Sequence, residues 1–236
     1  MFSRVISAAV YGIDAYIVNV ETDVGFGLPT FDMSGALGSK VREAKDRVRV
    51  AIKNSGIELT PQKIVINISP ANIRKEGTIY DLPIAIGILA ANGCFDLKIL
   101  ENVLIIGEVS LDGSINPVKG VLPMVCAAKE AGIDNCIIPK ANIAEGRIIN
   151  NINIYGVETL SQTIEILKNI AVIDGSRKNI KQADVKSGEC NKSDGNINND
   201  TYNVLERSRV KCTYGSEVKN NNHSCSYNID YSDISG

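Results

Sequence analysis

Apolar and polar residues alternate along much of the first 170 residues, in the pattern of strands with one buried face. The text RVISAAVYGIDAYIVNVETDV predicts two strands that meet at a turn near Gly12, Ile13 and Asp14. NVLIIGEVSLDGSINPV predicts a hairpin, because Asp112-Gly113 supplies the residue types that accept a positive φ. Three further strands are expected at KIVINIS, NCIIP and NINIYGV, over residues 63–69, 135–139 and 151–157.

Helical periodicity separates these strands. In residues 39–56, Val41, Ala44, Val48 and Ile52 recur at the spacing of one helix face. DLPIAIGILAANG predicts a second helix with Asp81 as its N-cap. That helix is apolar nearly all round, so we expect it to be deeply buried. Two more helices are expected over residues 119–132 and 159–169. Strands and helices that alternate in this way predict an α/β (α+β, two-layer) fold of about 170 residues.

The composition changes near Asp174, which divides the chain into two predicted regions. Residues 1–172 form the folded domain, and residues 173–236 form a low-complexity tail rich in Asn and Ser. Such a tail has too few apolar residues to offset the entropy lost on ordering, so we predict that it is disordered. Its Cys190, Cys212, His223 and Cys225 suggest zinc binding, but their spacing fits no zinc motif, and we favour unrelated residues in a polar tail.

The overall charge and the N-terminus narrow the function classes. The formal net charge is −2, whereas free-standing nucleic-acid binders usually carry a clear basic excess, so only a local basic patch remains open. MFSRVISAAVYG lacks the apolar core of a signal peptide, and no apolar run approaches the ~18 residues of a membrane span. We therefore expect a cytoplasmic protein with no membrane contact. Cys94, Cys126 and Cys136 lie in apolar segments and are interpreted as small core residues.

The usual catalytic and nucleotide-binding motifs are missing from the sequence. There is no G-x-x-x-x-G-K-[ST] and no G-x-G-x-x-G after a strand. The one histidine lies in the tail, which excludes a Ser-His-Asp site in the folded region. A serine–lysine pair needs no histidine, but it needs a lysine whose pKa is lowered by burial. The candidates for such a pair are Ser69, Ser110 and Ser114 with Lys75 and Lys119.

A basic stripe is expected on the helix at residues 39–56. Arg42, Lys45, Arg49 and Lys53 fall close to one helical face. They could contact phosphates or an acidic partner. The alternative, which we favour, is an ordinary solvated face.

Several longer stretches carry a family resemblance. The most specific are VREAKDRVR, INISPAN, KEG followed by DLPIAIG, and IGEVSLDGSINPVKGVLP. Over residues 1–170 the chain closely resembles the N-terminal domain of the ComM/YifB family of magnesium-chelatase-like AAA+ proteins. The resemblance implies a Lon-protease-like fold, also called ribosomal protein S5 domain 2-like. It also implies full-length relatives with an AAA+ ATPase module, which form hexameric rings and act as DNA branch-migration helicases in recombination and natural transformation.

The C-terminal part of the chain departs from that family pattern. IKQADVK, residues 180–186, resembles the segment that leads into the ATPase module, but no Walker A lysine or Walker B strand follows it. We therefore expect a chain cut short before the ATPase module, through truncation, a frameshift or deliberate shortening. No cofactor is expected in this chain, because ATP and Mg would belong to the AAA+ module. The expected partners are the AAA+ module of a full-length homologue and further copies of the chain, with DNA as a third candidate.

The resemblance extends to the protease domain of Lon, where a serine opens a buried helix after K-D-G. Here Lys75, Glu76 and Gly77 match the start of that loop, and Asp81 falls at the place of the serine. Leu122 takes the place of Lon's catalytic lysine. The resemblance thus implies the protease fold without its chemistry, and no catalytic, cofactor-binding or metal-binding residue is assigned.

Three hypotheses follow for the function. The first is a non-catalytic interaction domain, in which Lys75, Glu76, Gly77 and Asp81 form a partner-facing loop at the start of a buried helix. The second is a Lon-like peptidase with an unorthodox Ser–Lys pair. The third is a DNA-binding module that uses the basic helix at residues 39–56.

Overall fold

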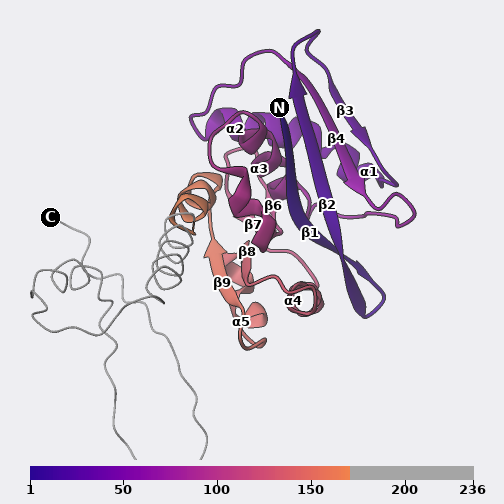
Figure 1. Ribbon diagram of the computed structural model, residues 1–236, viewed down its shortest axis with the longest axis vertical. Helices are drawn as coiled ribbons and strands as arrows, with labels where there is room; N and C mark the ends of the chain where they lie inside the picture. Colours follow the sequence, from indigo (N-terminus) through magenta and orange to yellow (C-terminus); the bar gives the residue numbers. More distant parts are fainter. Residues whose placement is uncertain (171–236) are drawn as a thin grey trace, which may run out of the picture. The chain divides into compact units, whose positions relative to one another are not determined.

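A seven-stranded mixed sheet organises residues 1–170, which are the residues that the computed structural model describes (Figure 1). They belong to one structural unit, Met1–Lys186, and a second unit, Ser187–Gly236, lies outside the described residues. In spatial order the strands are β3 (Phe31–Ser34), β4 (Lys63–Ser69), β2 (Asp14–Gly25), β1 (Phe2–Tyr11), β5 (Val103–Ile105), β8 (Asn135–Pro139) and β9 (Asn153–Val157). The α/β class is confirmed, but helices lie on both faces of the sheet, so the expected two-layer arrangement is wrong.

The strand directions divide the sheet into two halves. β1 and β2 form a long antiparallel hairpin, and β2 pairs antiparallel with β4, which pairs parallel with the short edge strand β3. On the other side of β1, strands β5, β8 and β9 are all parallel. The hairpin that the sequence predicts over residues 102–118 is only partly correct. Its first strand joins the main sheet as β5, whose three residues are all buried, and only β6 (Glu108–Val109) and β7 (Ile115–Asn116) pair as a hairpin.

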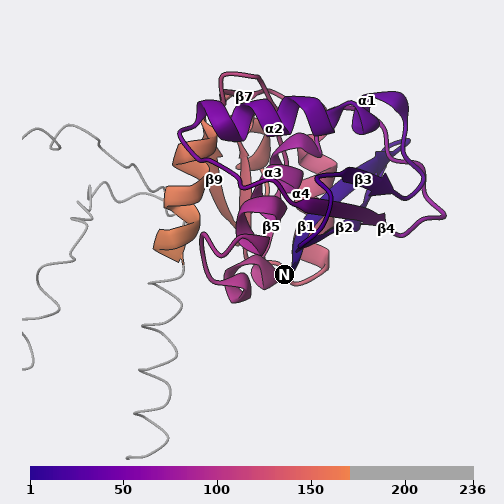
Figure 2. The same cartoon turned by 90° about the horizontal axis from the view of Figure 1, so that it is seen from above.

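Helices cover the sheet from both sides. On one face lie α2 (Ala44–Asn54), α3 (Asp81–Ala91) and a final helix over residues 160–170, packed on residues such as Val103, Ile105 and Ile137. On the other face α4 (Val121–Glu130) packs on Leu104, Cys136 and Ile138. Successive strand residues alternate between the two clusters, as the period of a strand requires. Figure 2 shows α2 lying over α3 on its side of the sheet.

Helix α3 is the most deeply buried element. All of its residues are buried, including Asp81, because the sheet and α2 enclose it. This confirms the burial expected from its all-round apolar sequence. The helix expected over residues 39–56 is interrupted at Glu43, so α1 (Ser39–Arg42) and α2 are separate elements.

The remaining short elements are loop-like. They are the 3₁₀ helices η1 (Leu97–Asn102) and η2 (Lys140–Asn142) and the one-turn helix α5 (Ile143–Gly146). Among the described residues, no helix is both long and apolar enough to cross a membrane. Cys136 is a buried free thiol, and its burial raises its pKa to about 12; Cys94 and Cys126 are half-buried and also free. The predictions of a disordered tail and of its zinc-like residues fall outside the described residues.

Candidate functional site

The loop between β4 and α3 is fixed by backbone pairing. It begins with a cis peptide bond between Ser69 and Pro70. Further along, the N–H of Lys75 donates to the carbonyl of Ala36 at 2.8 Å, and the N–H of Gly38 donates to the carbonyl of Lys75 at 2.9 Å. Gly77 has φ of +87°, a conformation that residues with a Cβ rarely adopt, and so turns the chain toward α3. The loop therefore has a defined path into the helix.

Lys75 lies inside the protein. Its side chain is 0% exposed, and its Nζ donates to the carbonyl oxygen of Pro70. Burial lowers the pKa of Lys75, because the charged form loses its hydration. The prediction that Lys75 faces a partner is therefore wrong, since its amine holds the loop together from within. Glu76 is exposed and forms an ion pair with exposed Arg74 at 2.7 Å, so this side chain does lie on the surface.

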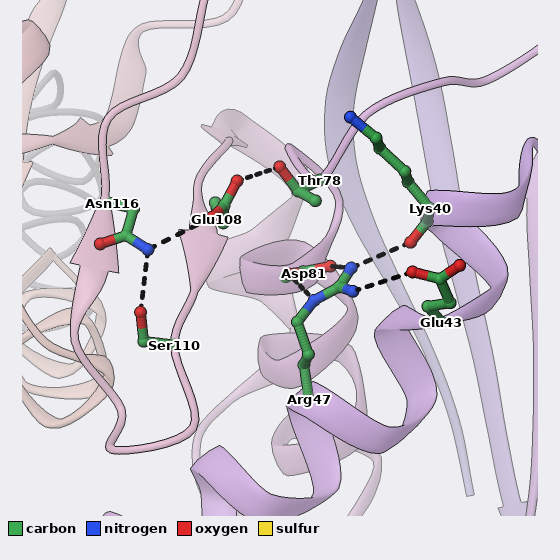
Figure 3. A network of polar contacts seen from close by, with 8 residues as sticks. All are labelled: Lys40, Glu43, Arg47, Thr78, Asp81, Glu108, Ser110 and Asn116. Atoms are coloured by element: carbon green, nitrogen blue, oxygen red, sulfur yellow. Dashed lines mark hydrogen bonds and ion pairs between the residues drawn. The ribbon is translucent and has the colours of Figure 1, made fainter.

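The centre of the site is an ion pair between α2 and α3, drawn in Figure 3. Arg47 Nε donates to Asp81 Oδ2 at 2.8 Å, and Arg47 Nη2 donates to Asp81 Oδ1 at 3.0 Å. Nη2 also donates to the carbonyl of Lys40 at 2.9 Å. Asp81 is 0% exposed, whereas the Arg47 side chain is 24% exposed. This bidentate contact satisfies the carboxylate in a place where an unpaired charge would be very costly.

The electrostatics of Asp81 reflect two opposing effects. Burial raises the pKa of Asp81 above its usual 3.8, while the hydrogen bonds and charge of Arg47 lower it. The backbone N–H of Val109 also donates to the carboxylate. Asp81 in turn raises the pKa of Arg47 through the hydrogen bond between them. Each charge of the pair therefore depends on the other.

Asp81 does not cap its own helix, which corrects the prediction from the sequence. The N-cap of α3 is Tyr80, in a right-handed helical conformation, and no side chain caps the helix. The first-turn N–H of Leu82 instead donates to the carbonyl of Gly107 at 3.0 Å. The physical reason is that the Asp81 carboxylate is already engaged by Arg47 and Val109. The prediction of Asp81 as a partner-facing residue is also wrong, because it has no exposed surface.

A second polar group lies beside this pair, on the hairpin β6–β7. Glu108 accepts a hydrogen bond from the Thr78 hydroxyl and one from Asn116 Nδ2 at 3.3 Å. Asn116 Nδ2 also donates to Ser110 Oγ at 2.8 Å. Figure 3 shows both groups around the start of α3. Most polar side-chain atoms of these two groups therefore form hydrogen bonds within their own group.

The position that corresponds to Lon's catalytic lysine is also occupied by a residue with a structural role. Leu122 is half-buried in the first turn of α4, and its N–H donates to Glu145 Oε1 at 2.8 Å. Lys119, three residues earlier, is exposed. Ser114 donates to Asp112 Oδ1 at 2.7 Å. None of the hydrogen bonds within residues 1–170 joins a serine hydroxyl to a lysine amine.

The predicted basic stripe is divided between two elements. Lys45, Arg49 and Lys53 are exposed at four-residue spacing on α2, whereas Arg42 is exposed on α1. The Arg49 guanidinium lies 6.0 Å from the centre of the Phe31 ring. These residues remain candidates for a surface contact.

The sequence did not identify Arg47 as a site residue. It is one of several bases in residues 39–56, and nothing in its spacing distinguishes it. The available signal was Asp81 itself, because an acid in an otherwise apolar helix needs a buried partner. That signal predicts a cationic partner, but it does not say which one.

Comparison with known proteins finds relatives of the N-terminal part of the chain, which contains this site. Residues 20–142 match the protein family described as subunit ChlI of Mg-chelatase. The chain is 36% identical over 163 residues to competence protein ComM of Haemophilus influenzae, which covers 69% of the chain and 32% of ComM. It is 40% identical over 148 residues to the uncharacterized protein YifB of Escherichia coli, covering 63% of the chain and 29% of YifB. Lon protease 2 of Bacillus subtilis is 32% identical over 133 residues, covering 56% of the chain and 24% of the protease. The chain thus spans about a third of the length of the ComM and YifB relatives.

Proposed function

Because this chain belongs to the Mg-chelatase subunit ChlI family and is similar to ComM and YifB, we propose that its folded region is a non-catalytic, Lon-protease-like interaction domain. The observation that carries the proposal is the Arg47–Asp81 pair. It occupies the place where the resemblance to Lon puts a serine nucleophile, and it leaves a charge-neutralised, buried carboxylate there.

The chemistry of this arrangement disfavours peptide hydrolysis. A serine–lysine dyad needs a hydroxyl within hydrogen-bond reach of a neutral amine. Lys75 has the lowered pKa that such a base requires, but its amine donates to the Pro70 carbonyl. At the second dyad position Leu122 has no group that can accept a proton. The site instead builds a stable connection between α2, α3 and the β6–β7 hairpin.

The similarity to longer relatives supports a proposal for the role of the domain. We propose that it works in the cytoplasm beside an AAA+ ATPase module, and that it helps copies of the protein to assemble into a hexameric ring. ATP and Mg would bind to the ATPase module, and this folded region would hold neither. By resemblance, the complete assembly is a DNA branch-migration helicase that acts in recombination and natural transformation. The name of the relative ComM, a competence protein, agrees with that process.

A DNA contact is the second candidate function, and a specific observation favours it. Lys45, Arg49 and Lys53 present three exposed cations in a row on α2. Such a row could follow a phosphate backbone without reading its sequence. The acidic residues Glu43 and Asp46 are exposed beside it, and the chain carries a net charge of −2, so we rank this function second.

A domain exchange tests the proposal. Residues 1–170 of this chain would replace the corresponding part of ComM in Haemophilus influenzae lacking its own ComM. We expect the chimera to assemble to the same size as ComM and to restore the transformation frequency. A chimera that behaves no better than ComM lacking this region would overturn the proposal. A matched chimera carrying Arg47→Ala should lose function together with folded protein.

A further inference from the structure

Large exposed apolar side chains gather at the two ends of β2. At its start, the tight turn from β1 carries Tyr11, 77% exposed, and Ile13, 90% exposed. After its end, the loop to β3 carries Phe26, 108% exposed, and Leu28, 84% exposed. β2 is twelve residues long, so the two places are roughly 40 Å apart at the rise of a strand. Figure 1 shows the β1–β2 turn and the β2–β3 loop at opposite ends of the hairpin.

The β2–β3 end also contains a groove. It has a volume of about 500 Å³, within the range of pockets that bind ligands or side chains. Its wall includes Pro29, Val50, Ile57 and Leu59, which are apolar. Its charged lining consists of Arg49, Lys53 and Glu58, so that cations outnumber anions there.

The opposite end is a projecting tip, defined here as residues 11–14. β4 pairs with β2 only from Asn19 onward, and β5 pairs with β1 only at Ile6. The last part of the hairpin therefore extends past both neighbouring strands. Gly12 has φ of +65°, which permits the two-residue connection and leaves Ile13 at the apex. The one charged residue of the tip is Asp14, which is exposed.

We infer that the groove receives the tip of a second copy of this chain. Ile13 and Tyr11 match the apolar wall, and Asp14 matches Arg49 and Lys53 in charge. This inference deepens the self-association proposed above, and it rests on that proposal. It assigns a further role to two of the basic residues, which would neutralise a carboxylate of the neighbouring copy.

The geometry of this contact has a consequence for assembly. Each copy offers a tip at one end and a groove at the other, so the contact is head-to-tail. Head-to-tail contacts close into rings when the rotation permits and otherwise continue as filaments. One tip in one groove is a small interface, so we expect weak association for an isolated pair and stronger association once a ring closes.

Photo-crosslinking tests the contact directly. A benzophenone amino acid would replace Ile13 in the full chain, and the products would be mapped by mass spectrometry. We expect cross-linked dimers whose second copy is modified within residues 49–64. The same probe at exposed Leu111, on the β6–β7 turn, is the matched control and should give none of these products. Cross-links between two tips, or none to the groove, would overturn the inference.

A charge exchange provides the second test. Asp14→Lys and Lys53→Glu should each lower the average mass measured by light scattering at about 100 μM, a concentration suited to weak contacts. The double variant should restore the mass, since the ion pair is rebuilt in reverse. Lys168→Glu, an exposed reversal on the final helix, should leave the mass unchanged. A chain that is monomeric throughout would defeat both the contact and the proposed self-association. Oligomers that do not respond to any of these changes would defeat the contact alone.

Discussion

Arg47 on α2 holds the fully buried carboxylate of Asp81 on α3 through two hydrogen bonds, of 2.8 and 3.0 Å. The two residues are 34 positions apart in the chain, and between them lie β4 and the loop that contains Lys75. The pair therefore fastens the outer helix to the most deeply buried one. It also fills the position at which a catalytic hydroxyl is expected from the likeness to Lon.

Removal of Arg47 should destabilise the fold strongly. Arg47→Ala leaves a buried carboxylate without its cation, a change that typically costs 3–5 kcal/mol, so we expect a loss of about 3 kcal/mol in the free energy of unfolding. Urea titration measures this loss. Lys45→Ala, an exposed change on the same helix, is the control and should stay within about 0.5 kcal/mol.

A second substitution should recover part of that loss. In Arg47→Ala/Asp81→Asn the buried side chain is neutral, so the cost of an unpaired charge disappears. The double variant should be more stable than Arg47→Ala alone. If it is less stable, the destabilisation does not come from the unpaired carboxylate.

The instability of Arg47→Ala should depend on pH in a defined direction. Burial raises the pKa of Asp81 above 3.8, and loss of Arg47 removes the main opposing effect, so the pKa rises further. The folded variant then binds the proton more tightly than the unfolded chain does. Its stability relative to the native protein therefore falls as the pH rises from the native pKa of Asp81 to the higher pKa of the variant, and stays low above it. Parallel urea titrations between pH 4 and 8 measure the difference, which would be flat if Asp81 were not the titrating group.

Gly87 should not tolerate a side chain, although it lies within a helix. A Cβ at this position would come within 2.6 Å of the Thr22 hydroxyl oxygen on β2. Gly87→Ala gains up to about 1 kcal/mol in helix propensity, but overpacking costs about 1–3 kcal/mol, so we expect a net loss of stability.

A second substitution, at Thr22, should restore part of the stability that Gly87→Ala loses. The Thr22 hydroxyl is buried and has no hydrogen-bond partner among the described residues, so Thr22→Ala removes the obstruction without breaking a hydrogen bond. Thermal unfolding of Thr22→Ala/Gly87→Ala should show a higher Tm than Gly87→Ala alone. An equal or lower Tm would mean that the strain lies elsewhere.

The basic stripe should not make the isolated chain a DNA-binding protein. Acidic Glu43 and Asp46 lie beside it, and the net charge is −2, so few counterions would be released on binding. Fluorescence anisotropy with labelled duplex and single-stranded DNA at low salt should show no saturable binding. Binding that falls steeply with salt, and that Arg42→Ala/Arg49→Ala weakens alike for all sequences, would contradict this expectation.

The sequence predicted most of the regular elements because their signals are local. The strand at residues 63–69 was placed with its observed bounds, and the burial of α3 followed from its apolar sequence. The interruption at Glu43 was not visible in the continuous helical periodicity of residues 39–56. The separation of β5 from the β6–β7 hairpin was not visible either, since β5 pairs with β1 and β8, which are distant in the chain. Asp81 was predicted to cap its helix because a local sequence rule favours an acidic residue there. Its actual partner, Arg47, is 34 positions away in the chain and could not be identified by a local rule. Lys75 was expected to face a partner as part of the loop before the buried helix, and only the folded loop shows that its amine points inward.

The central claim is that this domain keeps the fold of a serine–lysine protease without its chemistry. The most direct test is to treat the full chain with a fluorophosphonate probe and to find labelled serines by mass spectrometry, with Lon protease 2 of Bacillus subtilis as the active control. We predict that the control is labelled and that no serine of this chain is labelled above the level of its unfolded form. A stoichiometric adduct on one serine of the native chain, lost in Lys75→Ala or Lys119→Ala, would contradict the claim.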